Sequence, residues 1–174
     1  PKEELNRVIP ILEKIRAKFP KIIISIDTVR SKVAEEALLS GADIINDVSG
    51  GYSDKKIIDV AKRHKCPYIL THNIEKGVNT DKLKSDNPIK EQIRFFSKRI
   101  KELKSQGIYD IIIDPGFGFS KSIDQNFELI RFFEMLHILH APILIGISRK
   151  SMIYQTLEKS AENSLNGTTI MHSF

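Results

Sequence analysis

Polar side chains stand directly after several short apolar runs of the sequence, where they could take part in ligand chemistry. Asp27, Asn46 and Asp114 each follow such a run, and Lys150 lies just beyond another. A carboxylate can accept two parallel hydrogen bonds from a heterocycle that carries an amino group beside a ring N–H. A single residue of this kind can equally be a helix cap or a turn former, but several at equivalent places indicate a shared site.

The segment after Asp114 has the composition of a ligand-binding loop. It reads Pro-Gly-Phe-Gly-Phe at 115–119, so two glycines allow a sharp turn and close approach to a ligand, and two aromatic rings offer stacking surfaces. The alternative is an ordinary glycine-rich turn anchored by buried phenylalanines. Lys150 also has an alternative, as a solvated residue in the first turn of a helix. Gly146 and Ser148 favour the ligand-binding interpretation, since a glycine within a buried strand often marks close approach of another group.

Alternating helices and strands must position these residues. Apolar residues recur at steps of three and four in the helical segments, whereas the strand segments are short, continuous apolar runs rich in β-branched residues. Strands that alternate with helices at this spacing predict a parallel sheet, whose carboxyl ends share one rim. We expect helices at 3–19, 31–40, 54–64, 88–106 and 123–139, and strands at 22–26, 42–45, 67–71, 111–113 and 143–147.

Five predicted strands are compatible with an open doubly wound sheet or with part of an eight-stranded barrel. The barrel is favoured because the chain begins in or just before a helix without Met and stops within an apolar helical stretch. We therefore expect an α/β fold: an incomplete TIM (β/α)8 barrel of about five parallel strands, without its first two and last strands. Residues 1–174 would form one partial domain. The polar stretch 72–87 is predicted to be a mobile active-site loop.

Composition narrows the classes of partner. The net charge of +5 comes from 27 basic and 22 acidic residues spread along the chain, without a basic helix, which argues against nucleic acid and suits an anionic small substrate. Cys66 is the one cysteine, so no internal disulfide is possible, and no apolar run approaches a membrane span. We expect a cytoplasmic protein. His72 lacks a partner at metal-ligand spacing, which argues against zinc, and its role stays open between a structural one and substrate contact.

Four motifs together resemble the dihydropteroate synthase family. They are Ile-Asp-Thr at 26–28, Gly-Ala-Asp-Ile-Ile-Asn-Asp-Val-Ser-Gly-Gly at 41–51, Asp-Pro-Gly-Phe-Gly-Phe at 114–119 and Gly-Ile-Ser-Arg-Lys-Ser at 146–151. Each lies at a predicted strand end, and the similarity extends over essentially the whole chain. The resemblance implies a TIM barrel that holds a pterin in its mouth.

The family is a transferase of folate biosynthesis. It condenses 6-hydroxymethyl-7,8-dihydropterin diphosphate with p-aminobenzoate to give 7,8-dihydropteroate and diphosphate, with Mg²⁺ on the diphosphate. The resemblance implies that Asp27 and Lys150 are catalytic and that Lys121 lies on a loop adjoining the site. It further implies pterin contacts from Asp27, Asn46, Asp114 and Lys150, with the lysine toward the ring carbonyl, and p-aminobenzoate contacts from Phe119 and Ser148.

The chain departs from the family at several places. Thr71-His72-Asn73 stands where the family usually has Met-His-Met, and the family's Asn-Val-Thr-Pro-Asp loop and final Arg-x-His are absent. The Mg²⁺ ligand is expected in that N-terminal loop, so no metal ligand is expected in this chain, and the piece alone should not catalyse the reaction. The resemblance also implies a homodimer. A methyltetrahydrofolate-binding methyltransferase domain and a catalytically degenerate pterin-binding protein are the alternatives.

Overall fold

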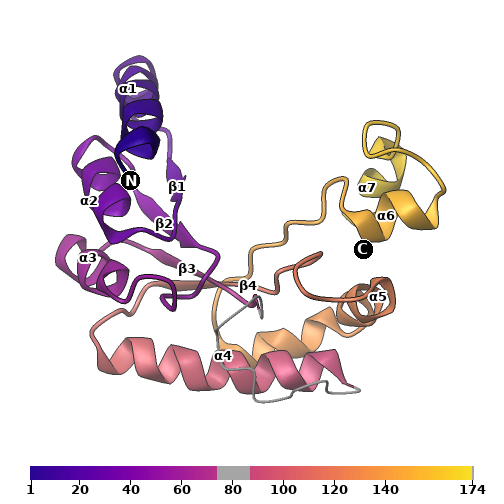
Figure 1. Cartoon of the computed structure of the whole chain (residues 1–174). Coiled ribbons are helices and arrows are strands. Elements are labelled where there is room, and N and C mark those ends of the chain that lie inside the picture. The colour runs from indigo at the N-terminus through magenta and orange to yellow at the C-terminus, as the bar shows by residue number, and fades with distance from the viewer. Residues whose placement is uncertain (74–86, 174) are drawn as a thin grey trace. The chain divides into compact units, whose positions relative to one another are not determined.

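Helices and strands alternate along the chain as far as residue 131, and further helices follow, in the structure, a computed structural model that describes residues 1–73 and 87–173 (Figure 1). The predicted mobile loop at 72–87 therefore falls almost entirely outside the described residues. The strands are β1 (Ser25–Asp27), β2 (Ile44–Asp47), β3 (Tyr68–Thr71) and β4 (Ile111–Asp114). The helices are α1 (Lys2–Lys18), α2 (Ser31–Leu39), α3 (Lys56–His64), α4 (Pro88–Ser105), α5 (Ile123–Arg131), the 3-10 helix η1 (Phe133–Leu139), α6 (Ser151–Thr156) and α7 (Leu165–Met171).

The four strands form one sheet in the order β1-β2-β3-β4. The pairs β1–β2 and β2–β3 are parallel, with Asp27 opposite Asn46 and Asp47 opposite Leu70. At the next pair the N–H of Tyr68 donates to the carbonyl of Asp110 at 2.9 Å, and four residues later in both segments His72 donates to Asp114 at 2.8 Å. Both segments thus advance in the same direction. The predicted parallel sheet is confirmed for these strands.

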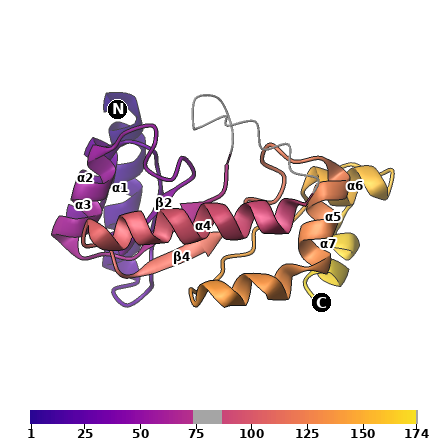
Figure 2. The same cartoon turned by 90° about the horizontal axis from the view of Figure 1, so that it is seen from below.

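The chain divides into two compact units, Pro1–Thr71 with Lys98–Ile113 and His72–Ser97 with Asp114–Phe174. In the first unit α1 packs against α2, and α2 against α3 (Figure 2). The apolar face of α3 is fully covered, since Ile57, Ile58, Val60 and Ala61 are all buried. Burial of this face stabilises the helix, because short helices depend on tertiary packing.

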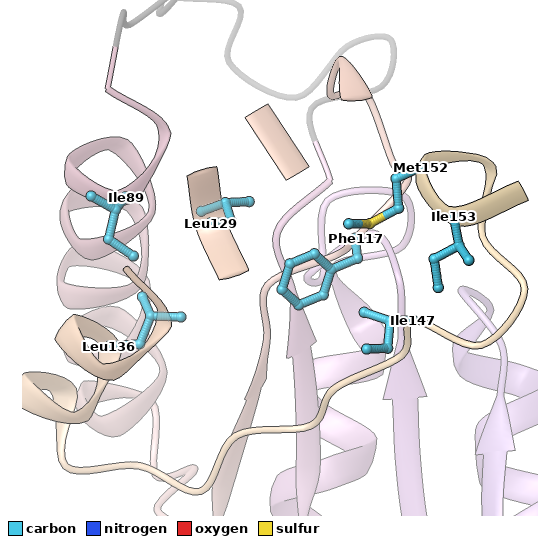
Figure 3. Close-up of a cluster of buried hydrophobic side chains, with 7 residues drawn as sticks. All are labelled: Ile89, Phe117, Leu129, Leu136, Ile147, Met152 and Ile153. Atoms are coloured by element: carbon cyan, nitrogen blue, oxygen red, sulfur yellow. The ribbon is translucent and has the colours of Figure 1, made fainter. Parts of the chain in front are cut away.

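The second unit has its own apolar core. In it α5 packs against α6, and α6 against α7. The sequence starts α5 clearly, because the Ser122 hydroxyl accepts from the Gln125 N–H while the Gln125 side chain accepts from the Ser122 N–H, which is a capping box. Figure 3 shows the buried side chains of this core, which are Ile89, Phe117, Leu129, Leu136, Ile147, Met152 and Ile153.

Three predicted elements differ from the structure. The strand expected at 22–26 is β1 at Ser25–Asp27, and Ile22 and Ile23 before it are exposed. The sheet has four strands among the described residues instead of about five, because 143–147 forms only an isolated bridge at Ile143, and Leu144 and Ile145 remain well exposed. A strand requires a neighbour to satisfy its backbone N–H and C=O groups, and an apolar run cannot reveal whether that neighbour is present. The predicted helix 123–139 is interrupted at Phe132 and continues as the 3-10 helix η1.

Candidate functional site

Asp27 and Asn46 lie side by side at the carboxyl ends of β1 and β2, as register partners in the sheet. Burial raises the pKa of the Asp27 carboxyl, and the nearby carboxylates of Asp47 and Glu4 raise it further. The Asn46 Oδ1 is buried and has no hydrogen-bond partner among the described residues. Because a buried acceptor without a partner is costly, this oxygen is suited to accept a hydrogen bond from a bound ligand.

Asp47 shapes the loop that follows β2. Its fully buried carboxylate accepts hydrogen bonds from the Ser49 N–H at 2.8 Å, the Ser49 hydroxyl at 2.7 Å, the Gly51 N–H at 2.7 Å and the Tyr68 hydroxyl at 2.7 Å. Hydrogen bonds to an ionised acceptor are stronger than neutral ones. Asp47 therefore fixes the backbone directly after Asn46.

Arg99 of α4 holds the same loop from another direction. Its Nε and Nη2 donate to the Gly50 carbonyl at 3.1 and 2.8 Å, and its guanidinium lies 4.8 Å from the centroid of the Tyr52 ring. Gly51 has φ +83°, and an added Cβ would meet the guanidinium at 2.8 Å. The glycine thus permits the close approach of Arg99, a role that the motif alone does not disclose.

Asp114 begins the glycine-rich loop in the second unit. Its carboxylate accepts from the Gly116 N–H at 2.8 Å, and its carbonyl accepts from the His72 N–H at 2.8 Å. Farther along the loop, Gln92 donates to the Pro115 carbonyl at 2.7 Å, and the Gly118 N–H donates to Asn126 at 2.8 Å. The ring of Phe117 is buried in the core shown in Figure 3. Phe117 thus anchors the turn in the core, as expected for an ordinary glycine-rich turn. Phe119 is only half-buried.

Phe119 and Lys150, both predicted site residues, meet in the structure. The Lys150 ammonium lies 4.5 Å from the centroid of the half-buried Phe119 ring, within the range of a cation–π interaction. Gly118 has φ +78°, and an added Cβ would approach the Lys150 Cδ to 3.1 Å. Ser148 is exposed two residues before Lys150. Asp114, Phe119, Ser148 and Lys150 all belong to the second unit, whereas Asp27 and Asn46 belong to the first.

Lys121 makes contacts that sequence reasoning missed. Its partly buried ammonium donates to the backbone carbonyls of His72 at 3.1 Å, Gly116 at 2.9 Å and Phe119 at 3.0 Å. Desolvation lowers its pKa to about 8, although the carboxylates of Asp114 and Glu91 act in the opposite direction. The His72 acceptor lies 49 positions away in the sequence, so no local pattern could have disclosed this arrangement.

The His72 side chain is buried, and its Nδ1 has no hydrogen-bond partner among the described residues. Its ring packs edge-on against Phe95 at 4.8 Å between centroids, and its Nε2 lies 3.9 Å from the Glu91 Oε1. Desolvation, assisted by the positive charge of Lys121, lowers the pKa of the imidazole to about 3. Burial also raises the pKa of Glu91. The imidazole is therefore neutral at physiological pH.

Among residues 1–73 and 87–173, no group of three or more His, Cys, Asp or Glu side chains could hold a metal ion. No helix within this described part of the chain is both long enough and apolar enough to cross a membrane.

The chain is similar to a known protein family and to individual proteins. The profile of the family described as pterin binding enzyme matches residues 1–173. A dihydropteroate synthase of Synechocystis sp. is 42% identical over 162 residues, which cover 91% of this chain and 55% of that protein. One from Clostridium beijerinckii is 39% identical over 168 residues, covering 95% of this chain and 60% of that protein.

A solved structure is similar over nearly the whole chain. The dihydropteroate synthase of Xanthomonas albilineans in complex with 7,8-dihydropteroate matches with a TM-score of 0.88 and 32% identity, over 98% of this chain and 63% of that one. This match confirms the predicted α/β fold, an incomplete TIM barrel. The chain spans about 55–60% of the length of the two curated relatives described above.

Proposed function

The chain belongs to the pterin binding enzyme family, and on this premise we propose that the protein carrying it is a dihydropteroate synthase. The reaction would join 6-hydroxymethyl-7,8-dihydropterin diphosphate to p-aminobenzoate in folate biosynthesis. The observation that carries the proposal is the Asp114 loop, in which a half-buried carboxylate is followed by an aromatic ring beneath the Lys150 ammonium. Carboxylate, ring and cation suit a pterin and an aromatic carboxylate.

Asp114 and Asn46 would recognise the pterin. A carboxylate has about four lone-pair positions, so that of Asp114, which accepts from the Gly116 N–H, can serve more than one donor. It would take the amino group and ring N–H of the pterin in parallel. The buried Asn46 Oδ1 would accept one further N–H.

Asp27 and Lys150 would act on the reacting atoms. As the amine nitrogen of p-aminobenzoate bonds to the hydroxymethyl carbon, the bond from that carbon to diphosphate breaks and positive charge develops on the carbon. A carboxylate in a partly desolvated place, such as Asp27, stabilises that charge. Lys150 would lie on the ring carbonyl side of the pterin, with Phe119 and Ser148 beside p-aminobenzoate.

Further features of the protein extend the proposal. We propose that Mg²⁺ would bind the diphosphate and would be held by residues outside the described part of the chain. A homodimer and a cytoplasmic location, without nucleic acid or membrane as partner, complete the proposal. The single cysteine is consistent with that compartment.

The test is turnover by the complete polypeptide that carries this chain. Pterin diphosphate and p-aminobenzoate, supplied with MgCl₂, should yield dihydropteroate and diphosphate. Pterin binding without turnover would favour the degenerate protein, and methyltetrahydrofolate binding without turnover would favour the methyltransferase domain. Asp114→Asn should weaken pterin binding, measured by calorimetry, by about 1–3 kcal/mol, because the amide replaces one acceptor with a donor. Unchanged affinity would contradict the assigned pairing.

A further inference from the structure

Lys121 lies beside the candidate site, and its position would suit either of two roles. A lysine next to a loop that binds anionic substrates could contact the substrate itself, or it could hold the loop. The two roles differ in where the ammonium donors point. An ammonium has three N–H donors and no acceptor.

The structure accounts for all three donors. The carbonyls of His72, Gly116 and Phe119 accept them at 3.1, 2.9 and 3.0 Å. None is left for a substrate while this arrangement lasts. Two of the three acceptors belong to the proposed binding loop. Gly116 lies two residues after Asp114, the carboxylate proposed to bind the pterin, and Phe119 carries the ring that contacts Lys150.

We propose that Lys121 is a positioning residue, which joins the end of β3 to the glycine-rich loop 115–121 and so presents Asp114 and Phe119 to the two substrates. This inference rests on the proposed function for the identity of the substrates. The joining of loop and strand end follows from the contacts of Lys121 alone.

The strength of the arrangement follows from charge and burial. Hydrogen bonds from a cation to carbonyl oxygens are stronger than neutral ones, and burial strengthens them further. Gly116 and Gly118 have φ +66° and +78°, in the left-handed region. Glycine can adopt many other backbone conformations as well, so its presence alone does not fix the shape of the loop. The side chain of Asn126 gives Gly118 a second attachment. Lys121 therefore selects one conformation of a segment with much conformational freedom.

The groups that face the ammonium predict a dependence on pH. Asp114 from β4 and Glu91 from α4 stabilise its charge, whereas Lys150, at the start of α6, and burial oppose it. With a pKa lowered to about 8, the ammonium loses its proton as pH rises through 8, and the neutral amine keeps only two donors. Loop order should therefore decline above that pH.

The experiment uses the complete polypeptide with three variants. Lys121→Met removes every donor at similar length, Lys121→Arg keeps the charge and the donors, and the exposed Lys159→Met is the matched control. Hydrogen exchange reports the amides of residues 116–120 directly. Calorimetry measures pterin binding, and steady-state kinetics separate KM from kcat for p-aminobenzoate between pH 7 and pH 9.5.

Lys121→Met should increase exchange at 116–120 by about tenfold while distant amides keep their protection, because local opening need not involve global unfolding. Its KM for p-aminobenzoate should rise about tenfold, with kcat changing less than about threefold, because uniform binding is lost. Lys121→Arg should restore exchange and KM in part and flatten the rise of KM above pH 8, since arginine stays protonated.

Two outcomes would overturn the inference. Native protection and native KM in Lys121→Met would show that the loop does not need the lysine, and a uniform loss of protection throughout the protein would make Lys121 a general stabilising residue. If wild-type protein binds no pterin, the proposed function fails, while the exchange of 116–120 still decides whether Lys121 positions the loop.

Discussion

The buried imidazole of His72 predicts that the protein loses stability in mild acid. Its pKa is lowered to about 3 in the folded state, whereas an unfolded histidine titrates at about 6.5. Between these values the unfolded chain binds the proton and the folded one does not. The free energy of unfolding therefore decreases as pH falls through 6.5, and this contribution is fully present only above that pH.

The magnitude follows from the size of the window. Each pH unit within it costs about 1.4 kcal/mol, so lowering the pH from 6.5 to 5 should remove about 2 kcal/mol of stability through this one residue. Glu91 works in the opposite direction, because burial raises its pKa and the folded state holds its proton more tightly. Lys121 contributes nothing in this window, since it is protonated in both states well below pH 8.

The assay is equilibrium unfolding in urea, followed by circular dichroism at pH steps from 7.5 to 5. Between pH 6.5 and 5, the free energy of unfolding of His72→Gln should fall by about 2 kcal/mol less than that of wild type. Glu91→Gln removes the opposing group and should steepen the wild-type dependence. In NMR spectra of the folded protein the His72 ring should not titrate above pH 4.5, and a titration near 6.5 would refute the reasoning.

Two further predictions concern the loops of the site. Gly118→Ala should cost about 1–2 kcal/mol of stability, because an L residue is strained at φ +78°. It should also weaken p-aminobenzoate binding, because the added methyl group displaces Lys150. The control is Gly146→Ala, whose added methyl group meets no atom within 4 Å. Equal unfolding free energies of the two variants would contradict the strain. Tyr68→Phe should lower the free energy of unfolding by about 2 kcal/mol, since it removes a 2.7 Å hydrogen bond to the buried carboxylate of Asp47. Tyr109→Phe, at a side chain 74% exposed, should lower it much less. Chemical denaturation measures both.

The residues at the strand ends could be predicted from the sequence because their signal is local. An apolar run followed by Asp27 or Asn46 requires only a parallel strand to place the side chain at the carboxyl edge, and the structure places both there. Asp114 likewise ends β4. The role of each toward a ligand stays a prediction.

Other features depended on contacts between distant segments. Tyr68 reaches Asp47 across 21 positions, and Arg99 reaches Gly50 across 49, so no short window contains either pair. The interruption of the predicted helix at Phe132 was missed for a different reason, because the apolar residues continue through η1 at spacings that suit an α-helix and a 3-10 helix equally. Strand 143–147 required a partner that its own residues do not specify.

The order of the strands in the sheet is also their order in the chain, and this bears on how the protein folds during synthesis. Ser25 pairs with Ile44 and Ile45 with Tyr68, so β2 and β3 each close a loop of about twenty residues onto the preceding strand. The loop that β4 closes is longer, since Tyr68 bonds to Asp110, 42 positions along the chain. The entropy lost on closing a loop grows only slowly with its length. These four strands can therefore pair one after another as the ribosome releases the chain.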